Sequence, residues 1–332
     1  MRPPFRILGW LLVVTGCNAY RCEGGRGNVP PPASWTIPKS SGVLQVPGHS
    51  SDASPRSGLR QGTEELTWTF EQSPVGRIDV VVVLPDRRPD ERFPLLIALH
   101  GRGEATKGPV RGARGWVDDY ALGRALRRLA MPPLRREDFE DIVEPHRLKL
   151  FNDALQANPY QGLVVLCPYT PDLLSGERVF ERVQPYARFL VETVIARARR
   201  ELPVIDSPAA TGIDGVSLGG RLSLLSGLSY PQAFGAVATL QAAFDSSEAP
   251  RLASLGVLAK KSNPNLKFRF LTSDGDYFLG ANHALDQAYS AVHVDHEFNV
   301  VTGPHDYIFN RGPGALEMLF WHDRALRGGT SR

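Results

Sequence analysis

A serine flanked by glycines is the first residue in this chain whose setting points to chemistry. Residues 211–227 read TGIDGVSLGGRLSLLSG, which places Ser217 between Gly215 and Gly219. A nucleophilic serine on a sharp turn from a strand into a helix needs small neighbours, because larger side chains would collide there. The sequence therefore predicts that Ser217 is a nucleophile. The alternative is a structural turn in a chain that contains 32 glycines.

A serine hydroxyl is a weak nucleophile until a base takes its proton, and histidine is the usual base. His305 lies in VVTGPHDYIF, after the last predicted strand and before the last predicted helix. A loop at that point projects over the carboxyl edge of a parallel sheet, where Ser217 is also expected. We therefore expect His305 to be the base. His100, in ALHGRGE, precedes Ser217 in the chain and is expected to position the neighbouring loop.

The third candidate is an acid that orients the histidine. Its carboxylate would fix the imidazole tautomer and stabilise the imidazolium. The segment FRFLTSDGDYF offers Asp276 and Asp274 at the end of the preceding strand. Asp276 is favoured because it lies deeper in the loop and Gly275 gives room for the turn. Asp274 is the alternative, and Asp245 after an earlier strand is a more distant one.

An ester-cleaving serine also needs two backbone donors that face the developing negative charge, which together form an oxyanion hole. The N–H of Leu218, directly after the serine, is the first predicted donor. The second is expected from HGRG, with Arg102 favoured and Gly103 as the alternative. Both predictions concern the backbone, so the side chains are free to serve elsewhere.

The segments that must position these residues alternate between strand and helix patterns from residue 63 onward. Two alternating segments around residues 73–76 predict an antiparallel hairpin. The later alternation predicts an α/β fold with a mostly parallel central sheet and helices on both faces. Strands are predicted over 64–72, 76–86, 93–101, 162–170, 209–215, 234–244, 266–273 and 296–303, and helices over 116–130, 178–200, 250–259, 280–292 and 313–326, with one more directly after Ser217.

The first residues of the chain have the pattern of an export signal. Arg2 and Arg6 precede the apolar run 7–14, which predicts a signal peptide over residues 1–16. The ending Val-Thr-Gly-Cys resembles the lipobox of bacterial lipoproteins, so Cys17 is predicted to carry the lipid and to anchor the protein to a membrane. The alternative is a plain secretory signal with an incidental cysteine.

Three segments follow from this organisation. Residues 17–62 are rich in Pro, Gly and Ser and are predicted to form the lipidated N-terminus and a disordered tether. Residues 63–332 are predicted to form the catalytic domain. Within it, residues 131–160 exceed an ordinary connection between a helix and a strand and are predicted to form a lid or an insertion. The protein is therefore expected to be exported, on the periplasmic or outer side of a bacterial membrane.

Composition excludes several other classes of function. The net charge is +3, and without Arg2 and Arg6 the count is 36 basic against 35 acidic residues, which argues against nucleic acid as a partner. Three cysteines without CxxC or Cys/His spacing predict no zinc site, and HVDH at 293–296 is more typical of a solvated loop than of a metal site. Cys167 is expected to be a buried apolar residue. No cofactor is predicted.

With ALHGRGE, GVSLGG, SDGDYFLGANHAL and GPHDYIF in this order, the chain resembles the esterase branch of the α/β-hydrolases. This branch includes esterase D, feruloyl and acetylxylan esterases, siderophore esterases and mycolyltransferases. The resemblance covers about residues 64 to 328. It implies the α/β-hydrolase fold and a cofactor-free carboxylesterase with Ser217, His305 and Asp276 as its triad. It does not identify the substrate.

The sequence thus predicts a lipid-anchored serine carboxylesterase that hydrolyses an ester outside the cytoplasm through an acyl-enzyme. The ester is expected to be a small molecule or part of a polysaccharide or lipid. Acyl transfer to an alcohol needs the same triad and stays an alternative. A non-catalytic hydrolase fold that serves as a surface binding protein is the alternative from another class. Peptidase activity has no specific support in the sequence. The oligomeric state is not predicted.

Overall fold

The computed structural model of the chain describes residues 63–174 and 178–328. The predicted signal peptide, the lipidated Cys17 and the tether over 17–62 lie outside these residues and stay predictions. Among the helices that are described, none is both long and apolar enough to cross a membrane.

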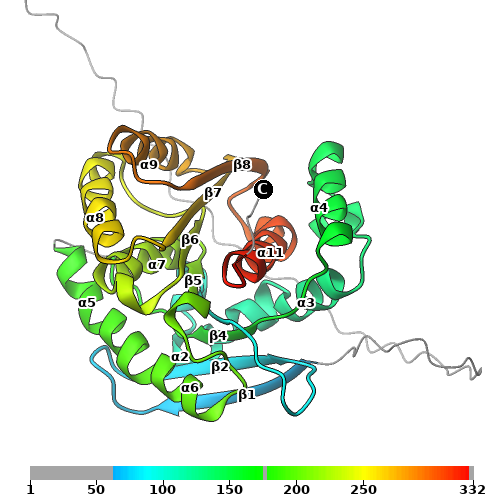
Figure 1. Cartoon of the computed structure of the whole chain (residues 1–332). Coiled ribbons are helices and arrows are strands. Elements are labelled where there is room, and N and C mark those ends of the chain that lie inside the picture. The colour runs from blue at the N-terminus through cyan, green and yellow to red at the C-terminus, as the bar shows by residue number, and fades with distance from the viewer. Residues whose placement is uncertain (1–62, 175–177, 329–332) are drawn as a thin grey trace, which may run out of the picture. The chain divides into compact units, whose positions relative to one another are not determined.

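The described residues are built around an eight-stranded sheet with the strand order β1-β2-β4-β3-β5-β6-β7-β8 (Figure 1). Strand β2 runs antiparallel to β1 and to β4, and the other neighbouring pairs are parallel. The predicted N-terminal hairpin and mostly parallel sheet are confirmed. The strands are β1 (Thr63–Phe70), β2 (Ile78–Pro85), β3 (Leu95–Leu99), β4 (Val164–Pro168), β5 (Thr211–Gly215), β6 (Ala236–Leu240), β7 (Lys267–Gly275) and β8 (Glu297–Pro304).

Continuous apolar runs form the central strands. Every residue of β3, β4, β5 and β6 is buried, as expected for parallel strands that are covered on both faces. Strands β1 and β8 lie at the two edges and are only partly buried. Cys167 in β4 is a free, buried thiol whose pKa is raised by burial, in agreement with its predicted role as an apolar residue.

Helices cover both faces of the sheet (Figure 1), as predicted. Alternate side chains of β2 enter two different cores, Val80 and Val82 on one face and Val81 and Val83 on the other, because side chains along a strand alternate between its faces. The first face carries α5 (Val179–Phe189), α6 (Ala196–Glu201), α7 (Leu218–Ser229), α8 (Ala249–Ser262) and α9 (Leu279–Ala291), and the second carries α3 (Leu122–Ala130), α4 (Pro145–Ala157) and α11 (Ala315–Ala325).

The predicted helix over 116–130 is interrupted in the structure. A π-helical turn, Gly115–Asp119, ends before Ala121, whose φ of +54° breaks the helix, and α3 follows. The side chains of Trp116 and Tyr120 are buried here, so tertiary packing overrides the local helical spacing. Two short helices that the sequence pattern did not predict, α1 (Arg102–Ala105) and α2 (Gly108–Gly112), fill the loop after β3. The predicted helix over 178–200 is formed by α5, a π-helical turn (Leu190–Ile195) and α6.

Residues 131–160 form a packed excursion. They contain a 3₁₀ turn, Arg136–Phe139, and helix α4. Phe139 and Phe151 are buried in the same core as α11. Arg147 on α4 also donates hydrogen bonds to both carboxylate oxygens of Glu317 on α11. These contacts attach the segment to α11, and the interpretation of residues 131–160 as a lid or an insertion stays a prediction.

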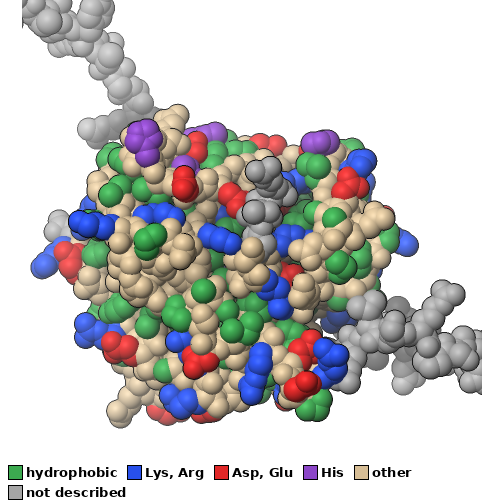
Figure 2. Space-filling model, viewed as in Figure 1, with side chains coloured by type: hydrophobic (Ala, Val, Ile, Leu, Met, Phe, Trp, Pro, Cys, Tyr) green, Lys and Arg blue, Asp and Glu red, His purple; other side chains and the backbone are tan. Residues whose placement is uncertain are grey.

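Charged side chains of both signs lie interspersed on the face shown in Figure 2. Several form pairs one helical turn apart, such as Lys149 with Asp153 and Arg197 with Glu201. Pairs of this kind contribute about 0.3–0.5 kcal/mol each, so they matter more for solubility than for stability. A face with both signs mixed also offers little attraction to a polyanion.

Candidate active site

Ser217 lies on a sharp turn between β5 and α7. Its backbone has φ +57° and ψ −114°, a conformation that costs on the order of 1–3 kcal/mol and persists only where its surroundings enforce it. A Cβ atom on Gly215 would lie 2.5 Å from the backbone of Gly219, and one on Gly219 would collide with the carbonyl oxygen of Leu99. Both glycines are therefore required for the turn, which agrees with the prediction from their spacing.

The structure brings the three predicted side chains together. The Oγ of Ser217 lies 3.0 Å from Nε2 of His305, and Nδ1 of His305 lies 2.7 Å from Oδ1 of Asp276. The three residues come from the ends of β5, β7 and β8, which lie at the same edge of the sheet. The His305 side chain is 15% exposed and that of Asp276 is fully buried. The arrangement is a continuous chain of hydrogen bonds from a partly exposed serine to a buried carboxylate.

Asp276 is held by neighbours on its own strand and loop. Its Oδ2 accepts a hydrogen bond of 2.5 Å from Thr272 Oγ1, and its Oδ1 accepts one of 2.9 Å from the N–H of Phe278. These donors fix the carboxylate in the orientation that faces the imidazole. The His305 ring also packs beside Tyr277 and Phe278, with ring centroids at 5.4 and 5.5 Å.

The two alternative acids do not reach the histidine. Asp274 is exposed, and its Oδ1 accepts a hydrogen bond of 3.0 Å from the N–H of Gly303, which ties the end of β7 to β8. Asp245 accepts from the N–H of Ser247 and caps a short 3₁₀ turn. Of the three candidate acids, Asp276 is the one that contacts His305, and its role as the triad acid stays a prediction.

Both predicted oxyanion donors are the first residues of helices. Leu218 begins α7 and Arg102 begins α1, and the N–H groups in the first turn of a helix have no acceptor within that helix. Strands β5 and β3, which lead into these helices, are parallel neighbours. The Arg102 side chain pairs with Asp172 at 2.9 Å, so its predicted contribution to the site would be made by its backbone alone.

His100 holds the loop that follows β3. It is completely buried, and burial lowers its pKa to about 4. Its Nε2 accepts a hydrogen bond of 2.8 Å from the N–H of Thr170, so Nδ1 carries the proton and donates to the carbonyl of Gly101 at 2.9 Å. The neutral imidazole therefore joins the ends of β3 and β4, which agrees with the positioning role predicted for it.

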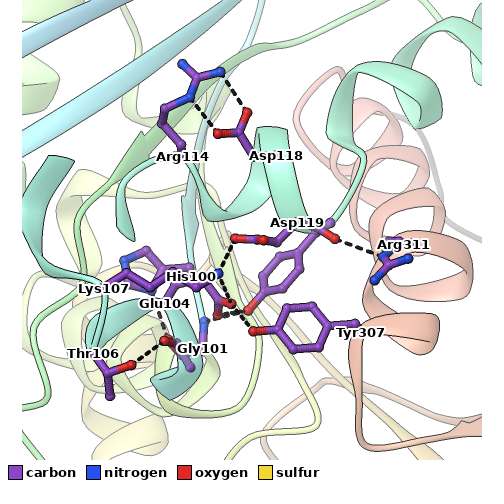
Figure 3. Close-up of polar contacts among 12 residues, drawn as sticks. His100, Gly101, Glu104, Thr106, Lys107, Arg114, Asp118, Asp119, Tyr307 and Arg311 are labelled. Atoms are coloured by element: carbon purple, nitrogen blue, oxygen red, sulfur yellow. Dashed lines mark hydrogen bonds and ion pairs between the residues drawn. The ribbon is translucent and has the colours of Figure 1, made fainter. Parts of the chain in front are cut away.

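A cluster around Glu104 was not predicted from the sequence (Figure 3). Glu104 is 1% exposed and accepts hydrogen bonds from the hydroxyls of Tyr120 and Tyr307. Glu104 directly follows the segment HGRG, residues 100–103, which is called the oxyanion loop below. Its two partners lie 16 and 203 residues away in the chain. Sequence spacing alone gives no reason to connect them.

The described residues contain no group of three or more His, Cys, Asp or Glu side chains that could hold a metal ion. Of the HVDH segment, His296 lies with its Nε2 3.0 Å from the acceptor Oδ1 of Asp286 and with its Nδ1 2.8 Å from the carbonyl oxygen of Val294. These contacts give it a structural place between α9 and β8.

Comparison with known proteins identifies the fold. No family model matches the chain, and no curated protein matches it. An S-formylglutathione hydrolase from Staphylococcus aureus aligns with a TM-score of 0.56 at 15% identity, over 79% of this chain and 99% of its own. A ferulic acid esterase aligns with a TM-score of 0.55 at 15% identity, over 80% and 98% of the two chains. An S-formylglutathione hydrolase from Agrobacterium tumefaciens aligns with a TM-score of 0.54 at 16% identity, over 81% and 98%. The chain therefore has the α/β-hydrolase fold that its sequence resemblance implied.

Proposed function

We propose that the chain is a serine carboxylesterase with Ser217 as nucleophile, His305 as general base and acid, and Asp276 as the group that orients His305. The observation that carries this proposal is the hydrogen-bonded chain from Ser217 Oγ through His305 to Asp276, at 3.0 and 2.7 Å. Its position at the carboxyl edge of an α/β-hydrolase sheet, on a strained turn before a helix, supports the same conclusion.

In the proposed reaction, Ser217 Oγ attacks the carbonyl carbon of the ester while His305 Nε2 takes the hydroxyl proton. The negative charge that develops on the carbonyl oxygen is stabilised by the backbone N–H groups of Leu218 and Arg102. Collapse of the tetrahedral intermediate breaks the bond to the alcohol, which leaves with the proton from His305. Water, activated by His305, then attacks the acyl-enzyme and releases the acid and the free serine.

The substrate is proposed to be a carboxylic ester of a small molecule, polysaccharide or lipid. Tyr277 is 83% exposed and its ring lies beside that of His305, so a bound substrate would meet an aromatic surface at this side of the site. Ferulic acid esterase among the structural neighbours makes aromatic acyl esters a sensible part of the test panel.

The test compares the wild type with Ser217→Ala on a panel of short acyl, feruloyl and catecholate esters. Loss of on the order of 10⁶ in kcat is expected when a triad loses its nucleophile. Ser229→Ala is the matched control, because this serine lies at the far end of α7 and its hydroxyl bonds only the carbonyl of Leu225. Near-normal hydrolysis by Ser217→Ala would overturn the proposal. Product analysis with an added glycerol or sugar acceptor distinguishes hydrolysis from acyl transfer.

We also propose that the protein is exported and anchored to a bacterial membrane through a lipid on Cys17, which the pattern of Arg2, Arg6 and the apolar run 7–14 supports. Fractionation of cells that express the full chain tests the location, and growth of these cells with a labelled fatty acid tests the anchor. Cys17→Ala should abolish the incorporation of labelled fatty acid into the protein. Incorporation to the wild-type extent in this variant would contradict the lipid anchor.

A further inference from the structure

Glu104 is a buried carboxylate that lies between two loops of the proposed active site (Figure 3). It belongs to α1, the short helix that begins with Arg102, the predicted oxyanion donor. A buried carboxylate is expensive unless each of its oxygens has a hydrogen-bond donor. The donors that satisfy Glu104 come from two different segments of the chain, and each segment leads to a different part of the site.

The first segment is the turn before α3. The hydroxyl of Tyr120 donates to Glu104 Oε2, and its oxygen accepts a hydrogen bond of 3.2 Å from the N–H of Gly101. Tyr120 is buried, and its pKa is raised by burial and by the carboxylate, so the hydroxyl keeps its proton for Glu104. These two hydrogen bonds give the N–H of Gly101 an acceptor and hold the backbone directly before the proposed donor Arg102.

The second segment is the loop that carries His305. The hydroxyl of Tyr307, two residues after His305, donates to Glu104 Oε1 at 2.7 Å. The same hydroxyl lies so close to Gly103 that a Cβ atom there would be 2.9 Å from it. Tyr307 therefore joins the histidine loop to the oxyanion loop by a hydrogen bond and by direct packing.

Basic side chains surround this cluster on its exposed side. Lys107 Nζ lies 3.6 Å from Glu104 Oε1 and 2.7 Å from Asp119, and Arg311 donates to the carbonyl of Asp119 at 3.0 Å. Both cations lie within 6 Å of the centre of the Tyr307 ring. These contacts hold Tyr307 in place and offset the buried charge.

We propose that Glu104 is a positioning residue that fixes the oxyanion loop and the His305 loop relative to each other through Tyr120 and Tyr307. The inference rests on the proposed esterase function. An oxyanion donor contributes only when it lies about 2.7–3.1 Å from the developing charge, and a misplacement of 1 Å can lower the rate by on the order of 10²-fold. One carboxylate that binds both loops meets this geometric requirement.

The main test is Glu104→Gln. An amide of the same shape offers one acceptor where the carboxylate offers two, so one tyrosine hydroxyl loses its acceptor. We expect kcat to fall by roughly 10- to 100-fold while KM changes less than about threefold, because the substrate still binds and the transition state is held less well. Titration with a fluorophosphonate should still label one serine per chain, but more slowly. A merely structural role would instead lower the fraction of chains that can be labelled.

Tyr120→Phe and Tyr307→Phe separate the two branches. Each should lower kcat, and adding either change to Glu104→Ala should lower it little further, because both hydroxyls act through the same carboxylate. Tyr289→Phe is the matched control. Tyr289 lies on α9 and packs against Gly256 of α8 and Phe270 of β7. Its hydroxyl is buried and has no hydrogen-bond partner among the residues that the structure describes, so kcat should not change.

The outcomes distinguish this inference from the proposed function. A wild type that hydrolyses esters and reacts with the fluorophosphonate, together with a Glu104→Gln variant within twofold of its kcat, would overturn the positioning role alone. Additive losses in the combined variants would also overturn it, because they would mean independent actions. A wild type that neither hydrolyses esters nor reacts with the fluorophosphonate would overturn both proposals together.

Discussion

Two of the aspartate–histidine pairs in the described residues, Asp276 with His305 and Asp214 with His322, have the same chemistry and different surroundings. In the first pair, Asp276 binds His305 at 2.7 Å, and the other nitrogen of His305 reaches Ser217. In the second pair, Asp214 of β5 binds Nε2 of His322 of α11 at 3.1 Å. The His305 side chain is 15% exposed, whereas both side chains of the second pair are completely buried.

The difference lies in what the second nitrogen meets. His322 Nδ1 has no hydrogen-bond partner within the described ranges 63–174 and 178–328. It faces Gly212, where a Cβ atom would lie 2.5 Å away. A pair with no nucleophile and no path for substrate can only stabilise the fold, so His322 ties α11 to the strand beneath Ser217. A carboxylate–imidazole pair is therefore a candidate for catalysis when its histidine has a third partner and is exposed to substrate.

The largest expected difference is between His305→Ala and His322→Gln. Loss of the proposed base should lower kcat by on the order of 10⁶-fold, since triad residues act as a unit. His322→Gln keeps an N–H donor for Asp214 and should leave kcat within about threefold of the wild type. Hydrolysis of a short acyl ester measures both variants. Equal losses in the two variants would erase the proposed distinction between the pairs.

A smaller effect should separate Asp276 from Asp274. Asp276→Asn keeps the shape but favours the wrong imidazole tautomer, which lowers kcat by about 10⁴-fold in a serine triad. Asp274→Asn changes a carboxylate that binds the N–H of Gly303, so its kcat should stay within about threefold. Steady-state kinetics of the two variants at one pH decide this. The larger loss in Asp274→Asn would return the acid to the alternative that the sequence left open.

The sequence was sufficient for the parts of the site that depend on order along the chain. Ser217, Asp276 and His305 each follow a predicted strand, and parallel strands bring their carboxyl ends to one edge, so the three meet in space. His322 and Asp214 are also a base and an acid near β5, and their burial and the absence of a third partner among the described residues distinguish them from the first pair. Burial of that kind depends on how α11 packs, which local patterns do not specify. The Glu104 cluster escaped prediction because Tyr120 follows a helix break and Tyr307 lies far along the chain.

The second pair should affect stability more than activity. Asp214→Ala leaves the N–H of Gly215, now bonded to Asp214 Oδ1 at 2.7 Å, and Nε2 of His322 without their acceptor in a buried site. Each unsatisfied buried group costs about 1–3 kcal/mol, so the loss of an acceptor by these two groups should lower the free energy of unfolding by about 2–6 kcal/mol. Urea unfolding measures this loss, and Ser229→Ala on the neighbouring helix gives the matched background. An unchanged unfolding midpoint would show that the pair does not stabilise the fold.

The pH dependence of stability should give the smallest effect and the finest comparison. Burial lowers the pKa of His322, and it lowers that of His100 to about 4, while an unfolded histidine titrates near 6.5. Between pH 4 and 6.5 an unfolded His100 binds a proton that the folded His100 does not. Just below pH 6.5 the same holds for His322, because its pKa is also lowered. The free energy of unfolding should therefore have its full value above pH 6.5. As the pH drops below 6.5, it should fall by up to about 1.4 kcal/mol per pH unit for each histidine. His322→Gln removes one of the two, so urea unfolding at pH 5, 6, 7 and 8 should give a shallower slope below pH 6.5. An identical slope in the two proteins would contradict the lowered pKa of His322 and the stabilising role of its burial.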